Sequence, residues 1–141
     1  RAARRTIDAA RGRLRAGDAL VIFGEGTRSR TCEMQPLLAG VTRYLDEEST
    51  WVLPVGITGT EGLFPIGDES LHPVRIGVQV GRPFPASALR AAAGRDRRLE
   101  VDAIGVAIAD ELPPPYRGVY GRRSTELEAA RHVLASSRRA R

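Results

Sequence analysis

Apolar and polar positions change their spacing several times along the first half of the chain. Residues 3–16 have helical spacing and are followed by Gly17, a residue type that commonly ends a helix. The unbroken apolar run at 19–23 is typical of a buried strand. Pro36 fits the first turn of another helix, because an amide donor is not needed there. One face of that helix would carry Leu37, Val41, Tyr44 and Leu45.

Strand-like and helical spacings also alternate in the second half. Residues 51–57 predict a strand, although Pro54 argues against a fully paired central position because it has no amide proton to donate. A long loop is expected at 59–70, and apolar residues at every second position of 74–80 predict a half-buried strand. Residues 97–111 predict a helix that three prolines terminate. Its apolar stripe consists of Val101, Ile104, Ile108 and Leu112.

This order of helices and strands favours an α/β fold, with helices packed on a mostly parallel sheet. A last helix is expected at 125–139, where Thr125 and Glu128 have capping-box spacing. The 141 residues are enough to bury a hydrophobic core. No apolar run approaches the ~20 residues that span a bilayer.

The formal net charge of +5 comes from arginine, because the chain contains no lysine. The single cysteine, Cys32, excludes an internal disulfide and fits a reducing compartment, and metal-site spacing of Cys and His is absent. The excess arginines form a basic tail that suits anionic lipid headgroups or nucleic acid, although a disordered solubilising extension is the simplest interpretation. They are Arg122, Arg123, Arg131, Arg138, Arg139 and Arg141.

The segment after the run at 19–23 combines glycine, carboxylate, hydroxyl and guanidinium groups. Ligands of α/β sheets usually bind outside the carboxyl ends of the strands. A guanidinium pairs with two phosphate oxygens at once, and glycines let the backbone approach a ligand closely. The segment therefore predicts an anion-binding loop. It consists of Phe23, Gly24, Glu25, Gly26, Thr27, Arg28, Ser29 and Arg30.

This segment resembles the Glu-Gly-Thr-Arg-Ser motif of glycerolipid acyltransferases, the lysophosphatidate acyltransferase group. Residues 52–60 are similar to that family's second proline-containing motif, and residues 112–120 to the usual end of its domain. The resemblance implies the αβα layered glycerol-3-phosphate acyltransferase-like fold, of which this chain would hold the later strands and helices. Residues 1–121 would be the C-terminal part of the acyltransferase domain, and 122–141 a basic tail, helical or disordered.

The resemblance also implies a reaction of phospholipid biosynthesis. An acyl group would pass from acyl-CoA or acyl carrier protein to a hydroxyl of a lysophospholipid or glycerol phosphate, with no bound cofactor and no metal. The enzyme would be cytoplasmic and peripheral, working on an anionic membrane surface at the cytoplasmic face. The substrate-binding residues would be Glu25, Gly26, Thr27, Arg28 and Ser29.

The family's catalytic element, a histidine followed five places later by an aspartate, is not present. His72 is followed at that distance by Gly77, and His132 by Ser137. We therefore predict no catalytic residue in this chain, which resembles the part of the domain downstream of the histidine and should be inactive alone. Leu38, where the family often has lysine, weakens the case for one strongly charged acceptor, so both acceptors are retained.

Each motif residue also has a simpler structural interpretation. Glu25 could cap nearby backbone, and Arg28 could form a surface ion pair of small energetic value. The motif context favours binding roles for both. For Thr27 and Ser29, hydrogen bonding to phosphate and stabilising the turn remain equal alternatives. Gly26 is expected to be needed for the backbone conformation in either case.

Two alternatives come from other classes of protein. One is a non-catalytic member of the same fold that binds anions or lipids. The other is an arginine-rich nucleic-acid-binding module. The second is less favoured because acidic residues lie between the arginines and only seven aromatic residues are available for stacking, so no nucleic-acid partner is expected. Cys32 and His72 are expected to be structural or loop residues rather than catalysts.

Overall fold

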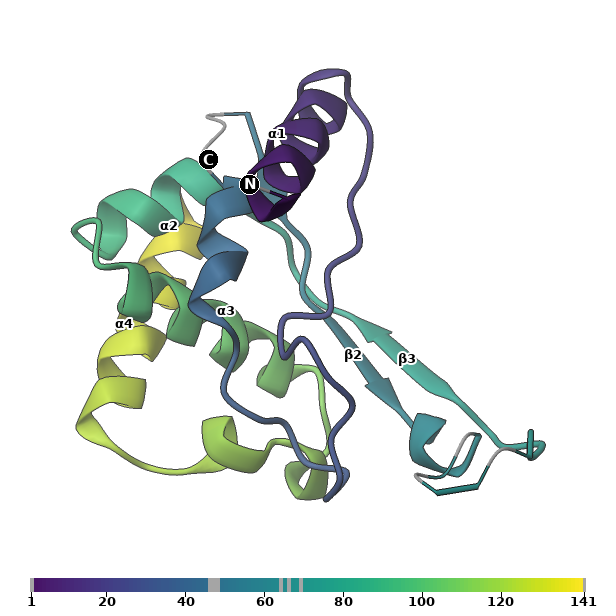
Figure 1. Ribbon diagram of the computed structural model, residues 1–141. Helices are drawn as coiled ribbons and strands as arrows, with labels where there is room; N and C mark the ends of the chain where they lie inside the picture. The colour runs from purple at the N-terminus through teal and green to yellow at the C-terminus, as the bar shows by residue number, and fades with distance from the viewer. Residues whose placement is uncertain (1, 46–48, 64, 66, 69, 141) are drawn as a thin grey trace.

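The computed structural model describes residues 2–45, 49–63, 65, 67–68 and 70–140. In that part of the chain a helical body carries a projecting antiparallel hairpin (Figure 1). The α-helices and strands are α1 (Ala2–Arg15), β1 (Trp51–Val52), β2 (Val55–Thr58), β3 (Gly77–Val80), β4 (Phe84–Pro85), α2 (Ala86–Ala92), α3 (Arg97–Asp110) and α4 (Thr125–Arg139). The 3₁₀-helices are η1 (Ala39–Leu45), η2 (Thr60–Gly62), η3 (Pro114–Tyr116) and η4 (Gly118–Gly121).

Helix α3 forms the centre of the helical body and contacts both α2 and α4. Asp96 caps its N-terminus by accepting hydrogen bonds from the amides of Arg98 and Leu99. The predicted helix is therefore confirmed to within one residue. Its burial is wider than the predicted apolar stripe, because residues 100–107 are all buried. Small residues on α3 let neighbouring elements approach from several sides, so this helix behaves as a core helix.

Two carboxylates on α3 are buried and both face arginines. Asp102 accepts a bidentate pair of hydrogen bonds from Arg98, one turn earlier on the same helix. This pairing raises the pKa of the Arg98 guanidinium. The Glu100 carboxylate lies 3.8 Å from Nε of Arg90 on α2. A buried charge is costly without a partner, so these arginines are part of the core's construction rather than surface decoration.

Tyr120 connects the core to the segment before η1. Its ring is buried against α3 at Gly105, where an added Cβ would collide with the ring. Its hydroxyl oxygen accepts a 2.9 Å hydrogen bond from the Leu37 amide. Burial is the main reason that the pKa of Tyr120 is raised. A single side chain thus joins η4, α3 and the chain that leads out of the motif.

Strand pairing is antiparallel throughout the described residues. Strand β1 pairs with β4, and β2 pairs with β3. The predicted strand at 51–57 is interrupted at Pro54, as its missing donor suggested. The predicted strand at 74–80 is shortened to β3, and the expectation that it is half-buried is wrong. All four of its residues are exposed, because the hairpin projects from the helical body and nothing covers its outer face (Figure 1).

The expected buried strand at 19–23 is also wrong. These residues have no assigned helix or strand, and Val21 and Phe23 are 81% and 75% exposed. Apolar character alone does not make a strand, because a strand exists only through backbone pairing with a neighbour. The described strands pair with one another and leave this run without a partner. The parallel pairing expected for the sheet is therefore not found among them.

Three further elements differ from expectation. The helix expected from Pro36 is the 3₁₀-helix η1, which begins at Ala39. Helix α2 was not predicted, although its alanine-rich sequence after Pro85 is a helix signal. Part of the long loop expected at 59–70 is the 3₁₀-helix η2, and positions 64, 66 and 69 lie outside the described residues.

Helix α4 has the predicted bounds, but its cap lies one residue earlier. Ser124, rather than Thr125, accepts the capping hydrogen bond, from the Leu127 amide. The helix packs on α2 and α3 and belongs to the core. It is therefore not a free extension, although position 141 lies outside the described residues. Its buried residues are Leu127, Ala130, Val133, Leu134 and Ser137.

We predict that Gly105→Ala destabilises the fold by about 1–3 kcal/mol, because the new methyl group overpacks the Tyr120 ring. Gly12→Ala is the matched control. A Cβ there meets nothing within 4 Å, so alanine in α1 should stabilise by about 0.5–1 kcal/mol. Urea unfolding of both variants measures the difference. A Gly105→Ala protein as stable as the Gly12→Ala protein would contradict the packing described.

Candidate functional site

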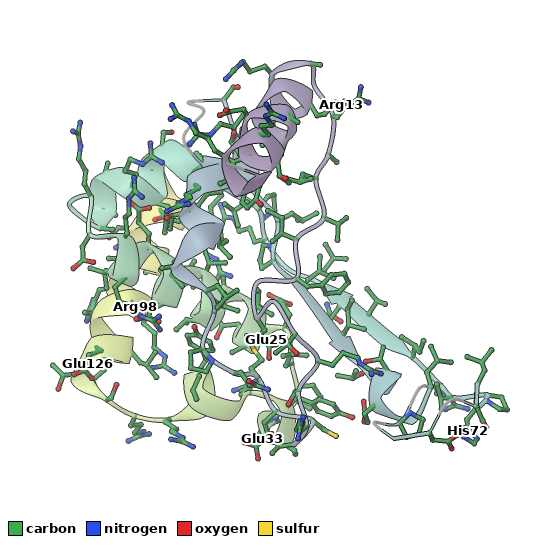
Figure 2. All side chains as sticks on the ribbon, viewed as in Figure 1. Arg13, Glu25, Glu33, His72, Arg98 and Glu126 are labelled. Atoms are coloured by element: carbon green, nitrogen blue, oxygen red, sulfur yellow. The ribbon has the colours of Figure 1, made fainter. Side chains whose placement is uncertain are left out.

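A cleft of about 970 Å³ lies between the predicted motif, β2 and the ends of α3 and η3. Figure 2 shows Glu25 between the helical body and the hairpin. All five predicted site residues, 25–29, line this cleft. Apolar side chains supply much of the rest of its surface. They are Ile22, Phe23, Met34, Leu37, Val55, Ile57, Leu63, Ile108 and Leu112.

The Glu25 carboxylate is half-buried and accepts a 3.0 Å hydrogen bond from the Gln35 amide. A second bond across the loop joins the Leu38 amide to the Gly24 carbonyl, at 2.9 Å. Glu25 therefore has the backbone-capping role that the sequence left as the simpler alternative. This role fixes the loop in a defined shape, which any ligand-binding role would also require.

Gly26 has the backbone requirement expected of it. Its φ of 71° lies in the left-handed region, and its amide donates to the Phe23 carbonyl at 3.0 Å, closing a turn. A Cβ at this position would also lie 2.5 Å from a methyl carbon of Leu38. Both conditions exclude other residue types without strain.

The three polar residues after Gly26 differ in their surroundings. Thr27 and Arg28 are exposed at the cleft, whereas Ser29 is half-buried. The Ser29 hydroxyl accepts a 3.2 Å hydrogen bond from the Thr31 amide. This contact is the turn-stabilising alternative for Ser29. It leaves Arg28 as the predicted residue with the charge and exposure that an anionic ligand needs.

The cleft also contains a polar pair that the sequence did not single out. The Tyr116 hydroxyl donates a 2.6 Å hydrogen bond to the Glu61 carboxylate, joining η3 to η2 at the base of the hairpin loop. This hydrogen bond is the largest cause of the lowered pKa of Glu61, and it also raises the pKa of Tyr116. The two residues are 55 positions apart, so no local spacing could have indicated their contact.

The two histidines lie outside the cleft lining. His72 is at the far end of the hairpin, away from Glu25 (Figure 2), where its Nε2 is 2.8 Å from the Asp68 carboxylate. Hydrogen bonds from Ser70 and His72 lower the pKa of Asp68. His132 is exposed on α4. Cys32 is exposed at the cleft, with a φ of 61°.

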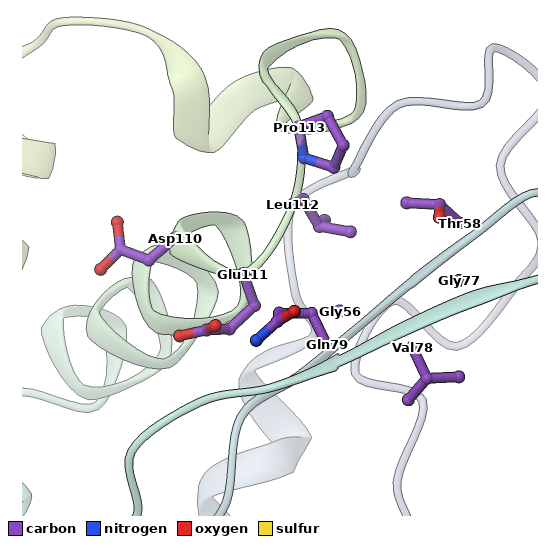
Figure 3. Close-up of a pocket in the computed structure, with 9 residues that line it drawn as sticks. All are labelled: Gly56, Thr58, Gly77, Val78, Gln79, Asp110, Glu111, Leu112 and Pro113. Atoms are coloured by element: carbon purple, nitrogen blue, oxygen red, sulfur yellow. The ribbon is translucent and has the colours of Figure 1, made fainter.

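A second cavity of about 470 Å³ lies on the other side of the hairpin (Figure 3). Gly56, Thr58, Gly77 and Gln79 line it from β2 and β3, facing the end of α3 at Glu111 and Leu112. Among the described residues, no group of three or more His, Cys, Asp or Glu side chains is placed to hold a metal ion. None of the described helices is long and apolar enough to cross a bilayer.

The chain is 30% identical over 106 residues to a 1-acyl-sn-glycerol-3-phosphate acyltransferase from Chlamydomonas reinhardtii. The matched region is 74% of this chain and 30% of that protein, so the chain spans less than a third of the relative's length. No family model and no solved structure matches the chain. The similarity supports a distant acyltransferase-like relationship, in agreement with the motif resemblance.

We predict that Tyr116→Phe raises the pKa of Glu61 toward its ordinary value of 4.5, because the main cause of the lowering is removed. In the native protein the depressed pKa means that the Tyr116–Glu61 bond stabilises the folded state above about pH 4.5. That contribution is lost as the pH falls through the lower folded-state pKa. NMR titration of the Glu61 carboxyl carbon measures the shift.

The Asp68 carboxylate is the internal control, because its partners are Ser70 and His72. Its titration should be the same in both proteins. A Glu61 pKa unchanged by Tyr116→Phe would mean that the phenol is not its main partner in solution.

Proposed function

We propose that this chain supplies the acceptor-binding part of an acyltransferase. The acyl group moves from the thioester of acyl-CoA or acyl carrier protein to a hydroxyl of a glycerol phosphate or lysophospholipid. The observation that carries this proposal is that the anion-binding motif and a largely apolar surface line one cleft. An acceptor of this class has both an anionic headgroup and, in lysophospholipids, an acyl chain.

The motif loop provides the headgroup site. The Arg28 guanidinium can pair with two phosphate oxygens, and the exposed Thr27 hydroxyl lies next to it in sequence. Gly26 lets the backbone pass close to the ligand, while Glu25 holds the loop in shape through Gln35. The apolar residues of the cleft then accommodate the non-polar part of the substrates.

The chemical step needs a general base. The base removes the proton of the acceptor hydroxyl, the oxygen attacks the thioester carbonyl, and the thiol leaves with a proton. General-base help is typically worth ~10²–10⁴-fold in rate. Neither histidine of this chain lines the cleft, so we propose that the base comes from outside these 141 residues. The chain would then form later elements of the αβα layered acyltransferase fold, at the cytoplasmic face of a membrane.

One observation favours the second candidate, a non-catalytic anion- or lipid-binding protein of this fold. The cleft has a binding loop and an apolar wall, but no histidine lines it. Both candidates share the same binding site and differ only in the base. The first prediction below concerns the base, and the second concerns the site.

We predict that the 141-residue chain alone does not catalyse acyl transfer, because it has no histidine-aspartate pair of the acyltransferase spacing. The measurement is free-thiol release from acyl-CoA in the presence of lysophosphatidate. A Glu25→Ala variant serves as the background control. Turnover clearly above that control would contradict the assignment of the base to another segment.

We predict that Arg28→Ala weakens binding of glycerol 3-phosphate to this chain by about 1.5–3 kcal/mol, the range for a charge-assisted hydrogen bond. Isothermal titration calorimetry measures the dissociation constant, and the water-soluble ligand separates headgroup binding from lipid partitioning. Arg122→Ala is the matched control, an exposed arginine outside the cleft lining. Equal losses in the two variants would show only a general charge effect and would count against the motif site.

A further inference from the structure

One face of the β2–β3 hairpin is apolar and open. Directly opposed residues of antiparallel strands lie on the same face, and Val55 is opposite Val80 as Ile57 is opposite Val78. Ile57, Val78 and Val80 are 40%, 61% and 54% exposed, whereas Val55 is half-buried. We call these four residues the apolar hairpin face. Contiguous exposed apolar residues on a projecting element mark an interaction surface.

The other face of the hairpin is already occupied. Gly56 and Gln79 form the alternate cross-strand pair, and a Cβ at Gly56 would lie 2.6 Å from the Glu111 carbonyl oxygen. Figure 3 shows Gln79 beside Glu111 and Val78 pointing away from it. The hairpin therefore packs its small and polar side against the end of α3. Its apolar side faces outward as a consequence.

The apolar hairpin face is continuous with the candidate site. Val55 and Ile57 line the cleft together with Ile22 and Phe23 of the exposed run before the motif. A lipid that reaches the motif loop from this side would stay in contact with apolar side chains along the way. Because the acyl chains of such substrates lie in bilayers, a cleft that opens through this face would receive them directly from a membrane.

Charge distinguishes a lipid surface from a second copy of the chain. Arg75 and Arg82 are exposed, two residues before and two residues after β3. Lipid phosphates would attract both arginines. In a symmetric dimer through this face, each protomer would bring the same arginines toward its partner, and the net charge of +5 would add to the repulsion.

The basic C-terminal helix is a poorer membrane contact than its sequence suggests. The apolar stripe of α4 includes Leu127, Ala130 and Leu134, and all three are buried against the helical body. Only polar and charged groups of α4 remain for a membrane. The tail could add electrostatic attraction, but it has no apolar stripe to insert.

We propose that the apolar hairpin face docks on the surface of a lipid bilayer that contains anionic lipids, with Arg75 and Arg82 beside the phosphates. The inference rests on the proposed function only for the direction in which the lipid enters the cleft. Binding is mainly hydrophobic, because the apolar side chains enter the interface while acidic groups near the cleft offset its arginines. It should therefore persist at high salt, unlike binding through a basic tail.

The experiment compares the full 141-residue chain with a Val78→Ser/Val80→Ser variant in co-sedimentation with vesicles. The vesicles contain phosphatidylcholine and phosphatidylglycerol in equal parts, at low and high salt. Two fully inserted valine side chains are each worth ~1.5–3 kcal/mol, so their partial insertion should lower the partition coefficient of the variant by about tenfold or more. Gln79→Ser is the matched control on the opposite face of β3, and it should bind like the native chain.

Circular dichroism of the variants checks that the exposed substitutions leave the fold intact. The proposal is overturned if the native chain does not bind vesicles, or if Val78→Ser/Val80→Ser binds as well as Gln79→Ser. It is also overturned if light scattering shows a native dimer that this variant abolishes while vesicle binding is absent. Vesicle binding requires no acyl transfer, and glycerol 3-phosphate binding requires no vesicle, so failure of either proposal is recognised separately.

Discussion

The packing of Tyr120 against Gly105 is the constraint on which the position of the candidate site depends. Glycine at this point of α3 allows the ring to lie directly on the helix backbone. The buried hydroxyl then accepts the Leu37 amide, and the chain running back from Leu37 to the motif is held at the core. Without that hydrogen bond a buried amide would have no acceptor, at a cost of about 1–3 kcal/mol.

The same region is fixed a second time through backbone contacts. The Met34 amide donates to the Tyr116 carbonyl, and the Val119 amide donates to the Met34 carbonyl. The Arg98 guanidinium, already paired with Asp102, also donates to the Leu37 carbonyl at 3.4 Å. The motif loop therefore leaves and returns to a rigid frame. A loop held in this way can bind a ligand with little loss of conformational entropy, which is the usual condition for an effective anion site.

The hairpin has the opposite character. One face packs on the end of α3, where Gly56 admits the Glu111 carbonyl, while the other presents valine and isoleucine side chains to the outside. The cleft lies where these two kinds of surface meet, with the motif loop on one side and β2 on the other. A polar loop fixed to a core and an apolar strand left open together form a site suited to an amphipathic ligand.

Helical periodicity and capping residues were sufficient to predict α1, α3 and α4 from the sequence, because these signals act within a few residues of one another. Pro54 likewise indicated an interruption in its strand, since a missing donor is a local property. The composition of residues 25–29 pointed to one binding loop, and the structure places all five on one cleft.

The tertiary structure alone decided which apolar segments are buried. The run at 19–23 and the alternation at 74–80 have the composition of buried strands, but burial depends on a partner that only the fold supplies. The opposite holds for α4, whose arginine-rich sequence resembles a free tail and whose apolar residues complete the core. The Tyr116–Glu61 pair and the contact of Tyr120 with Leu37 join residues 55 and 83 positions apart. Local spacing carries no information about such pairs, because their proximity is created only when the chain folds.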